Sequence, residues 1–216
     1  MCKRFLPLLG VVLVALMVSE ASAATTKAAT FSIPTERASG QKNAPIVIEV
    51  FTDFQCPHCS EFYLQTLTRV MEDYCSKGKV YLIHREFPLH QFHYSREAAR
   101  WALACAGIGQ YDLAAAALFR DQMIWGRSGN IEPTIASVLT PAELKKVKQE
   151  MTDSKQKIDS ALERDIFAGN TFQIHGTPSF RILVHGSEVY ASHGDPGTSF
   201  PSYVILKRFL DEKLAK

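Results

Sequence analysis

The chain has 216 residues, of which 24 are Lys or Arg and 22 are Asp or Glu, so its formal net charge is only +2. This balance excludes a nucleic-acid binder driven by a basic surface, and a content of 46% hydrophobic residues excludes a disordered chain. Five cysteines are too few for a disulfide-dense scaffold, and a chain of this length buries a core without such bonds.

Residues 1–23 have the pattern of a cleavable secretory signal peptide. Two basic residues precede an apolar run over residues 5–18, and the small residues Ala21 and Ala23 end the segment. The run is shorter than the about 20 apolar residues of a spanning helix, although an uncleaved N-terminal anchor is the alternative. Cleavage leaves residues 24–216 with four cysteines and predicts an exported, periplasmic protein, in a compartment where thiols can pair.

The first half of the mature chain predicts a strand–helix–strand unit. Residues 24–44 are polar and small, and we expect an extended lead-in there. Residues 46–51 are almost continuously apolar and β-branched, which predicts a buried strand. Apolar residues near helical spacing predict a helix over 60–74, and residues 80–83 form a second buried strand. This order predicts parallel pairing with a right-handed crossover.

The second half predicts a helical subdomain followed by a hairpin. Residues from about 94 to 169 read as helices, with an alanine-rich segment and a capping box at residues 140–143. Residues 180–184 and 188–191 predict an antiparallel hairpin, and a last helix follows over 202–214. The predicted fold class is α/β, with a mixed sheet (βαβ, then ββα) and a helical subdomain inserted between its halves.

The segment Cys56-Pro57-His58-Cys59 lies where the first strand gives way to a helix. At a helix N-terminus, free N–H groups and the positive end of the helix dipole stabilise a thiolate. They lower the pKa of a cysteine such as Cys56 from about 8.5 to between about 3.5 and 7.5. Cys59 lies one turn further, and we expect it to be buried and to attack a mixed disulfide formed at Cys56. A protonated His58 would stabilise the reduced form further and make the disulfide more oxidising.

Half of a zinc site has the same cysteine spacing. A zinc ion would need further ligands, and the chain has no other C-x-x-C segment. The candidates are His84, His90 and His93, which we interpret instead as surface or loop residues. We therefore expect neither a metal nor a cofactor.

Four segments of the chain combine in a specific way. They are Phe51-Thr52-Asp53-Phe54-Gln55-Cys56-Pro57-His58-Cys59, Arg85-Glu86-Phe87-Pro88-Leu89, the alanine-rich helix with Cys105, and Gly176-Thr177-Pro178-Ser179-Phe180. In this order they resemble the DsbA-like branch of the thioredoxin superfamily over nearly all of residues 24–216. The resemblance implies a thioredoxin fold and an exported thiol–disulfide exchange activity.

The resemblance also implies roles for particular residues. Cys56 is the exposed nucleophile and Cys59 the resolving thiol, with Pro57 and His58 between them. The bond between Thr177 and Pro178 is a cis peptide packed against the cysteine pair, and it presents the backbone of Thr177 to an extended substrate.

Glu49 is a carboxylate within a predicted buried strand, which is costly unless it is used or paired. The family often has an acidic group beneath the cysteine pair. We therefore predict that Glu49 moves a proton to or from Cys59.

Cys75 and Cys105 have two interpretations. They form a second, structural disulfide that ties the first helix to the helical subdomain, or they are two buried thiols that pack as small hydrophobic side chains. We favour the disulfide because the predicted compartment is oxidising.

The leading functional hypothesis is a dithiol oxidase that donates its disulfide to reduced or unfolded exported proteins. A DsbB-like membrane partner then reoxidises it, and we expect a monomer. The closest alternative is an isomerase or reductase of the same fold, which Thr177 before Pro178 fits, whereas Pro57-His58 fits the oxidase. Two weaker alternatives are a periplasmic metal-binding chaperone and a peptide-binding module with inert cysteines.

Overall fold

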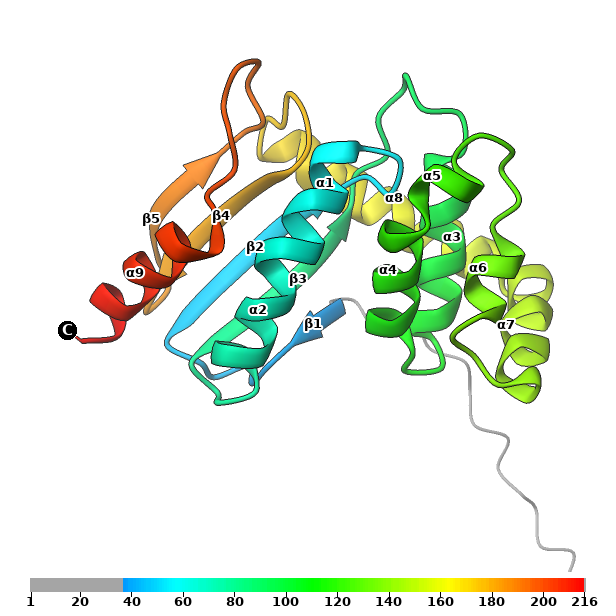
Figure 1. Ribbon diagram of the computed structural model, residues 1–216, viewed down its shortest axis with the longest axis horizontal. Coiled ribbons are helices and arrows are strands. Elements are labelled where there is room, and N and C mark those ends of the chain that lie inside the picture. The colour runs from blue at the N-terminus through cyan, green and yellow to red at the C-terminus, as the bar shows by residue number, and fades with distance from the viewer. Residues whose placement is uncertain (1–36, 216) are drawn as a thin grey trace, which may run out of the picture. The chain divides into compact units, whose positions relative to one another are not determined.

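A five-stranded mixed sheet forms the centre of residues 37–215, the part of the chain that this computed structural model describes (Figure 1). Its strand order is β1-β3-β2-β4-β5. The central strand β2 (Ile46–Thr52) runs parallel to β3 (Val80–Glu86) and antiparallel to β4 (Ser179–Val184), which pairs antiparallel with β5 (Ser187–Ser192). The predicted α/β class, with βαβ followed by ββα, is confirmed.

The edge strand β1 (Arg37–Ser39) lies within the segment expected to be a lead-in, and it pairs antiparallel with β3. No strand was predicted here, because three residues are too few to show a hydrophobic period. The signal peptide predicted for residues 1–23 lies outside the described residues and stays a prediction.

One continuous helix covers residues 57–75, longer at its start than the predicted 60–74. It comprises α1 (Pro57–Phe62), η1 (Tyr63–Leu67), α2 (Thr68–Val70) and η2 (Met71–Cys75), in which η1 and η2 are π-helical turns. Gly78 follows it with a φ of 67°, a left-handed conformation that glycine adopts without steric cost. Apolar side chains of the helix and of β2 make the main core between them.

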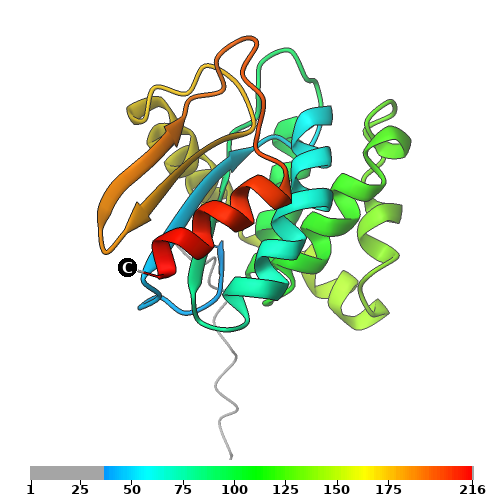
Figure 2. The same ribbon diagram turned by 60° about the vertical axis from the view of Figure 1, so that its left-hand side comes forward.

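Helices cover both faces of the sheet (Figures 1 and 2). The helix of residues 57–75 and α9 (Tyr203–Leu214) pack together on one face. The last helix of the inserted subdomain, α8 (Lys155–Thr171), packs against β3 on the other face. The segment Cys56-Pro57-His58-Cys59 therefore follows the central strand β2 and lies on the same face of the sheet as α9.

The helical subdomain lies between β3 and β4 in the chain. Its other helices are α3 (Ser95–Ala106), α4 (Tyr111–Arg120), α5 (Gln122–Trp125), α6 (Glu132–Ala136) and α7 (Pro141–Asp153). The predicted capping box is present, with Thr140 and Glu143 bonded to each other's backbone N–H. Alanines on α3 and α4 are fully buried, which allows these two helices to pack closely.

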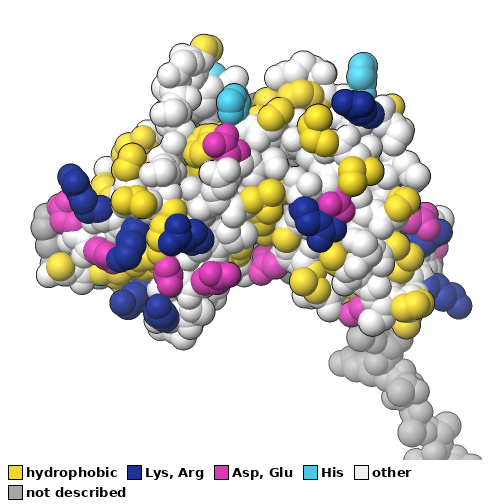
Figure 3. Space-filling model, viewed as in Figure 1, with side chains coloured by type: hydrophobic (Ala, Val, Ile, Leu, Met, Phe, Trp, Pro, Cys, Tyr) yellow, Lys and Arg dark blue, Asp and Glu magenta, His cyan; other side chains and the backbone are white. Residues whose placement is uncertain are grey.

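The surface carries charges of both signs, interspersed on the face in Figure 3. Among the described residues, no helix has the length and apolar character that crossing a bilayer requires.

Candidate redox site

Cys56 is the N-cap of α1, directly after the loop that leaves β2. Pro57 occupies the first helical position, where its missing N–H costs nothing. The Cys56 Sγ lies 3.3 Å from the backbone oxygen of Thr177, to which it donates a hydrogen bond, and the peptide bond between Thr177 and Pro178 is cis. The structure thus brings together two segments that lie about 120 residues apart in the sequence.

The two thiols of the motif differ strongly in acidity. The pKa of Cys56 is lowered to about 6, chiefly because the Cys59 thiol donates a hydrogen bond to it. Burial opposes this shift, while a hydrogen bond from the Thr177 side chain and others from the backbone N–H groups of Cys59 and His58 support it. The pKa of Cys59 is raised well above 9, chiefly by burial, since Cys59 is fully buried. At neutral pH the reduced pair therefore holds a thiolate at Cys56 and a thiol at Cys59.

Cys56 and His58 depart in detail from what the sequence implied. Cys56 is only 5% exposed, so it is not the freely exposed thiol that the resemblance implies. The His58 side chain is exposed, with its ring centroid 6.4 Å from that of Phe200. The contribution of His58 to the acidity of Cys56 is a hydrogen bond from its backbone N–H, whereas the sequence suggested the charge of its ring.

Cys56 opens into a groove of about 440 Å³ whose walls come from four segments. Figure 3 shows it as the hollow between two projecting loops, residues 87–94 and 193–202. Its lining comprises Cys56, Pro57, His58, Leu89, Gln91, Phe92, Gly176, Thr177, Pro178, Ser192, Gly194, Asp195, Pro196, Gly197, Thr198, Ser199 and Phe200. The Cys56 thiol thus lies at a groove to which both loops contribute.

Two glycines allow the walls of this groove to meet. A Cβ on Gly194, whose φ is 71°, would lie 2.2 Å from the backbone oxygen of Gly176. The backbone N–H of His175 also donates to the backbone oxygen of His193 at 2.8 Å. These contacts hold the loop before β4 against the loop after β5 and so fix the position of Thr177.

Glu49 does not lie beneath the cysteine pair, and its predicted role is wrong. Its two carboxylate oxygens accept hydrogen bonds from Arg85 Nε at 2.8 Å and Arg181 Nε at 2.7 Å. Glu49 alternates along β2 with Ile48 and Val50, which belong to the core under the redox helix (residues 57–75), so Glu49 points to the other face of the sheet. Two guanidinium groups neutralise this buried carboxylate, which accounts for its place in a strand.

The acid next to the pair is Asp53, which sequence reasoning missed. Its backbone N–H lies 3.5 Å from the Cys59 Sγ, and its carboxylate accepts hydrogen bonds from the N–H groups of Gln55 and Leu89, both at 2.7 Å, and from the Ser95 hydroxyl. Burial, with a smaller contribution from the charge of Cys56, raises the pKa of Asp53 to about 6, although the three hydrogen bonds to its carboxylate oppose this shift. Its position three residues before Cys56, within the motif itself, was the available signal.

Gln122 of the helical subdomain binds the loop that leads from β2 to Cys56. Its Nε2 donates to the backbone oxygens of Phe54 at 2.6 Å and of Cys56 at 3.0 Å. The sequence did not predict this contact, because Gln122 lies more than 60 residues from the Cys-Pro-His-Cys motif.

Cys75 and Cys105 are separate buried thiols in the structure, so the disulfide that we favoured is not formed there. Burial raises the pKa of each to about 12. The other interpretation, two packed thiols, describes their surroundings, since both belong to the apolar core.

The three histidines considered as metal ligands differ in their exposure to solvent. His90 and His93 are exposed, as expected. His84 is 1% exposed, so its interpretation as a surface or loop residue is wrong, and burial lowers its pKa to about 4. Within residues 37–215, no three His, Cys, Asp or Glu side chains are grouped so as to hold a metal ion.

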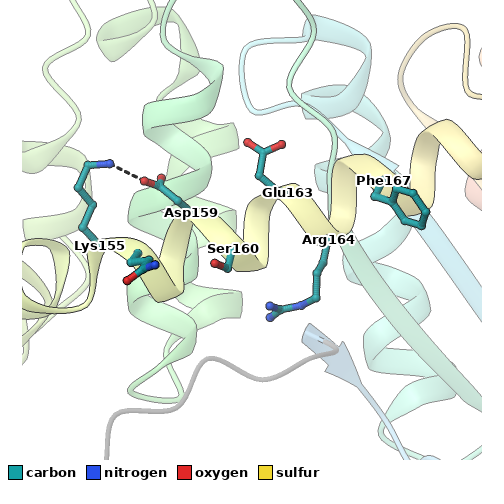
Figure 4. Close-up of a pocket in the computed structure, with 7 residues that line it drawn as sticks. Lys155, Asp159, Ser160, Glu163, Arg164 and Phe167 are labelled. Atoms are coloured by element: carbon teal, nitrogen blue, oxygen red, sulfur yellow. Dashed lines mark hydrogen bonds and ion pairs between the residues drawn. The ribbon is translucent and has the colours of Figure 1, made fainter.

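A second hollow lies along α8 and contains no thiol (Figure 4). Its side chains all come from this one helix: Lys155, Gln156, Asp159, Ser160, Glu163, Arg164 and Phe167. Lys155 and Asp159 form an ion pair one turn apart.

A low-pKa thiol at a helix N-terminus, a buried partner thiol one turn on, and a cis-proline loop against them define a thiol–disulfide oxidoreductase with a thioredoxin fold. A family model described as Thioredoxin matches residues 32–193, about three quarters of the 216 residues. The chain belongs to the thioredoxin family.

Individual relatives agree with this assignment. The probable disulfide bond formation protein D of Bacillus cereus is 25% identical over 193 residues, which span 86% of this chain and 82% of that protein. The crystal structure of alpha-DsbA1 from Wolbachia pipientis is similar with a TM-score of 0.65 at 21% identity, covering 86% of this chain and 94% of that one. Oxidised BdbD from Bacillus subtilis has a TM-score of 0.64 at 21% identity, covering 86% and 96%.

Proposed function

We propose that the protein is an exported dithiol oxidase, which introduces disulfide bonds into exported proteins through the Cys56–Cys59 pair. The observation that carries this proposal is the position of Cys56 at the N-terminus of α1, where hydrogen bonds from the Cys59 thiol and from backbone N–H groups lower its pKa to about 6. A stabilised thiolate stabilises the reduced form of the pair, which makes its disulfide easy to donate. The name of the Bacillus cereus relative, a probable disulfide bond formation protein, supports the same direction.

The reaction follows from the geometry of the groove. An extended segment of a reduced protein lies along the Thr177 backbone, and its thiolate attacks the Cys56 sulfur of the oxidised pair. The bond between Cys56 and Cys59 breaks, and its electron pair leaves with Cys59, which takes up a proton. A second substrate thiolate then attacks the substrate sulfur of the mixed disulfide, and Cys56 departs as a thiolate. The substrate loses two electrons and two protons, of which one remains on Cys59 at neutral pH.

Completing the proposed cycle requires a second protein that reoxidises the Cys56–Cys59 pair. The reduced pair must return two electrons to an acceptor, and a membrane redox partner of the DsbB-like kind would receive them. Export would depend on residues 1–23 acting as a cleavable signal peptide. Fusion of these residues to a reporter enzyme that is active only outside the inner membrane tests this part, with residues 24–216 alone as the control.

The direction of exchange is tested with reduced, unfolded ribonuclease A. The oxidised protein is mixed with it in the absence of glutathione, and the remaining substrate thiols are counted. An oxidase removes two substrate thiols for each molecule of protein, and a Cys56→Ser variant removes none. If the protein instead leaves reduced ribonuclease untouched but restores activity to scrambled ribonuclease, it is an isomerase and the oxidase proposal fails.

A further inference from the structure

The groove at Cys56 is lined almost entirely by uncharged residues. Among its described lining residues, Asp195 is the only Asp, Glu, Lys or Arg. It lies in the loop between β5 and α9, and its side chain is 50% exposed. In the oxidised protein the sulfur atoms of Cys56 and Cys59 carry no charge. A substrate that enters the groove at that stage therefore meets a negative charge at Asp195.

A tight turn fixes the position of Asp195. Its backbone oxygen accepts hydrogen bonds from the backbone N–H of Thr198 at 3.0 Å and from the Thr198 hydroxyl at 2.6 Å. Pro196 and Gly197 occupy the two central positions, and the φ of 84° at Gly197 is that of a type II turn. The carboxylate is thus carried by a defined piece of backbone on the wall of the groove.

His175 holds the Asp195 side chain from the opposite loop. Its Nδ1 lies 2.6 Å from the Asp195 Oδ1, and its ring is 60% exposed. His175 precedes by two residues Thr177, whose backbone oxygen accepts the hydrogen bond from the Cys56 thiol. The pair therefore joins the carboxylate to the loop that lies against Cys56. A neutral imidazole leaves the full negative charge on Asp195, and only a protonated one cancels it.

We propose that Asp195, held by His175, selects substrate segments that carry a lysine or arginine close to their reactive cysteine. This proposal rests on the proposed function, since the segment must lie along the Thr177 backbone to reach Cys56. A cationic side chain on that segment pairs with the Asp195 carboxylate, whereas an acidic side chain is repelled by it. Asp195 contacts a side chain of the substrate and none of the reacting atoms, so the exchange chemistry stays as described above.

Oxidation of peptides measures the preference. Each peptide contains two cysteines and one guest residue, lysine or glutamate, at one of the three positions before the first cysteine or after the second. The oxidised protein is added at pH 8, where an imidazole in water is neutral, and the loss of peptide thiols is followed. At 20 mM salt we expect the lysine peptide to react about three- to tenfold faster than its glutamate counterpart at one or more positions. Equal rates for every pair overturn the proposal.

Asp195→Asn assigns the preference to this carboxylate. Asparagine keeps the size of the side chain and a bonding partner for His175, but it carries no charge. The ratio of the lysine rate to the glutamate rate should fall at least about threefold below that of the wild type. Comparing two proteins on the same peptides removes the effect that a lysine has on the acidity of a neighbouring thiol, since this effect is common to both.

His175→Lys leaves Asp195 in place and sets a fixed positive charge beside it. This variant should lower the ratio as far as Asp195→Asn does. At 500 mM salt the ratios of the wild type and both variants should converge, because exposed charges are then screened within a few Å. A ratio that stays at the wild-type value in either variant at low salt overturns the proposal, as does a difference that salt leaves unchanged.

Glu188→Gln is the matched control. Glu188 lies on β5, is 46% exposed and is not among the residues that line the groove. Its ratio should stay within about 1.5-fold of the wild type, and a fall as large as that of Asp195→Asn would show a general effect of protein charge and overturn the role of Asp195. If no peptide is oxidised at all, the proposed function fails. If every peptide is oxidised with the same ratio in all four proteins, only the selection by Asp195 fails.

Discussion

Cys56, Cys75 and Cys105 are all at most 5% exposed, yet they differ in what surrounds their sulfur atoms. Burial without compensating donors raises the pKa of Cys75 and Cys105 to about 12. At Cys56, hydrogen bonds from Cys59 and from backbone N–H groups outweigh burial and lower the pKa to about 6. In this protein the hydrogen-bond donors around a cysteine, rather than its exposure, therefore decide whether it reacts.

The largest expected effect on activity comes from replacing Cys56, compared with replacing either of the packed thiols, Cys75 and Cys105. Cys56→Ser should lower the rate of catalysed disulfide exchange by about 10³-fold or more, because the hydroxyl does not form the covalent intermediate. Exchange is measured with the ribonuclease assay. The Cys75→Ala and Cys105→Ala variants should stay within about twofold of the wild type, and a loss comparable to that of Cys56→Ser in either would break the comparison.

Alkylation by iodoacetamide sharpens the difference in acidity. The rate at Cys56 should rise as the pH rises through about 6, since the thiolate is the reacting form. At pH 7 Cys56 should react at least about 10³-fold faster than Cys75 or Cys105, which are both buried and protonated. Mass spectrometry of peptides resolves the sites, and a Cys56 midpoint above pH 8 would contradict the assigned environment.

Asp53→Asn changes the surroundings of Cys56 while both thiols remain. The folded-state pKa of Asp53, about 6, lies above the ordinary aspartate value of 3.8, so the unfolded chain ionises first and stability falls as the pH rises from about 4 to 6. This loss, on the order of 3 kcal/mol, should be absent from the variant. Urea unfolding at pH 4 and pH 7 measures it.

Two further readouts accompany this variant. Removal of the buried negative charge should lower the alkylation midpoint of Cys56 by less than about one pH unit. The lost hydrogen bonds to Asp53 should cost the same free energy at each pH and leave the trend intact. An equal loss of stability between pH 4 and 7 in the wild type and the variant counts against a raised pKa at Asp53.

The smallest effect concerns packing alone. Cys105→Ala removes a buried sulfur from the apolar core and should lower the free energy of unfolding by about 1 kcal/mol, measured by urea denaturation. Serine in Cys105→Ser has nearly the shape of cysteine but buries a hydroxyl, and this variant should lower the free energy of unfolding by about 1–3 kcal/mol. A stability loss well beyond this range, seen only under oxidising conditions, would mean that Cys105 is bonded after all.

The sequence was informative wherever a local pattern carries the structure. Continuous apolar runs predicted β2 and β3, and the Cys-Pro-His-Cys segment predicted a thiol at a helix N-terminus, because both depend on neighbouring residues. Thr177 and Pro178 could be placed against Cys56 only through the family resemblance, since no local rule joins segments so far apart. The strand β1 was missed because pairing with β3, rather than its own composition, makes it a strand.

The site was less predictable where the direction of a side chain decides its role. Glu49 and Glu86 are both buried carboxylates in adjacent strands, and neither their type nor their spacing reveals which face each occupies. The register shows Glu49 beside Arg181, while Glu86 lies opposite Thr52 on the face beneath the redox helix. The sequence therefore suggested Glu49 as the acid beneath the cysteine pair, although Asp53, three residues before Cys56, is the one that lies next to Cys59.

If the Cys56 thiolate makes this pair oxidising, the redox equilibrium of residues 24–216 with glutathione must show it. The state of Cys56 and Cys59 is read by alkylation and mass at pH 7. We predict a reduction potential between about −120 and −180 mV, the range of proteins that readily donate a disulfide. A potential near about −270 mV, as in thioredoxin itself, would make the pair an electron donor and contradict the account.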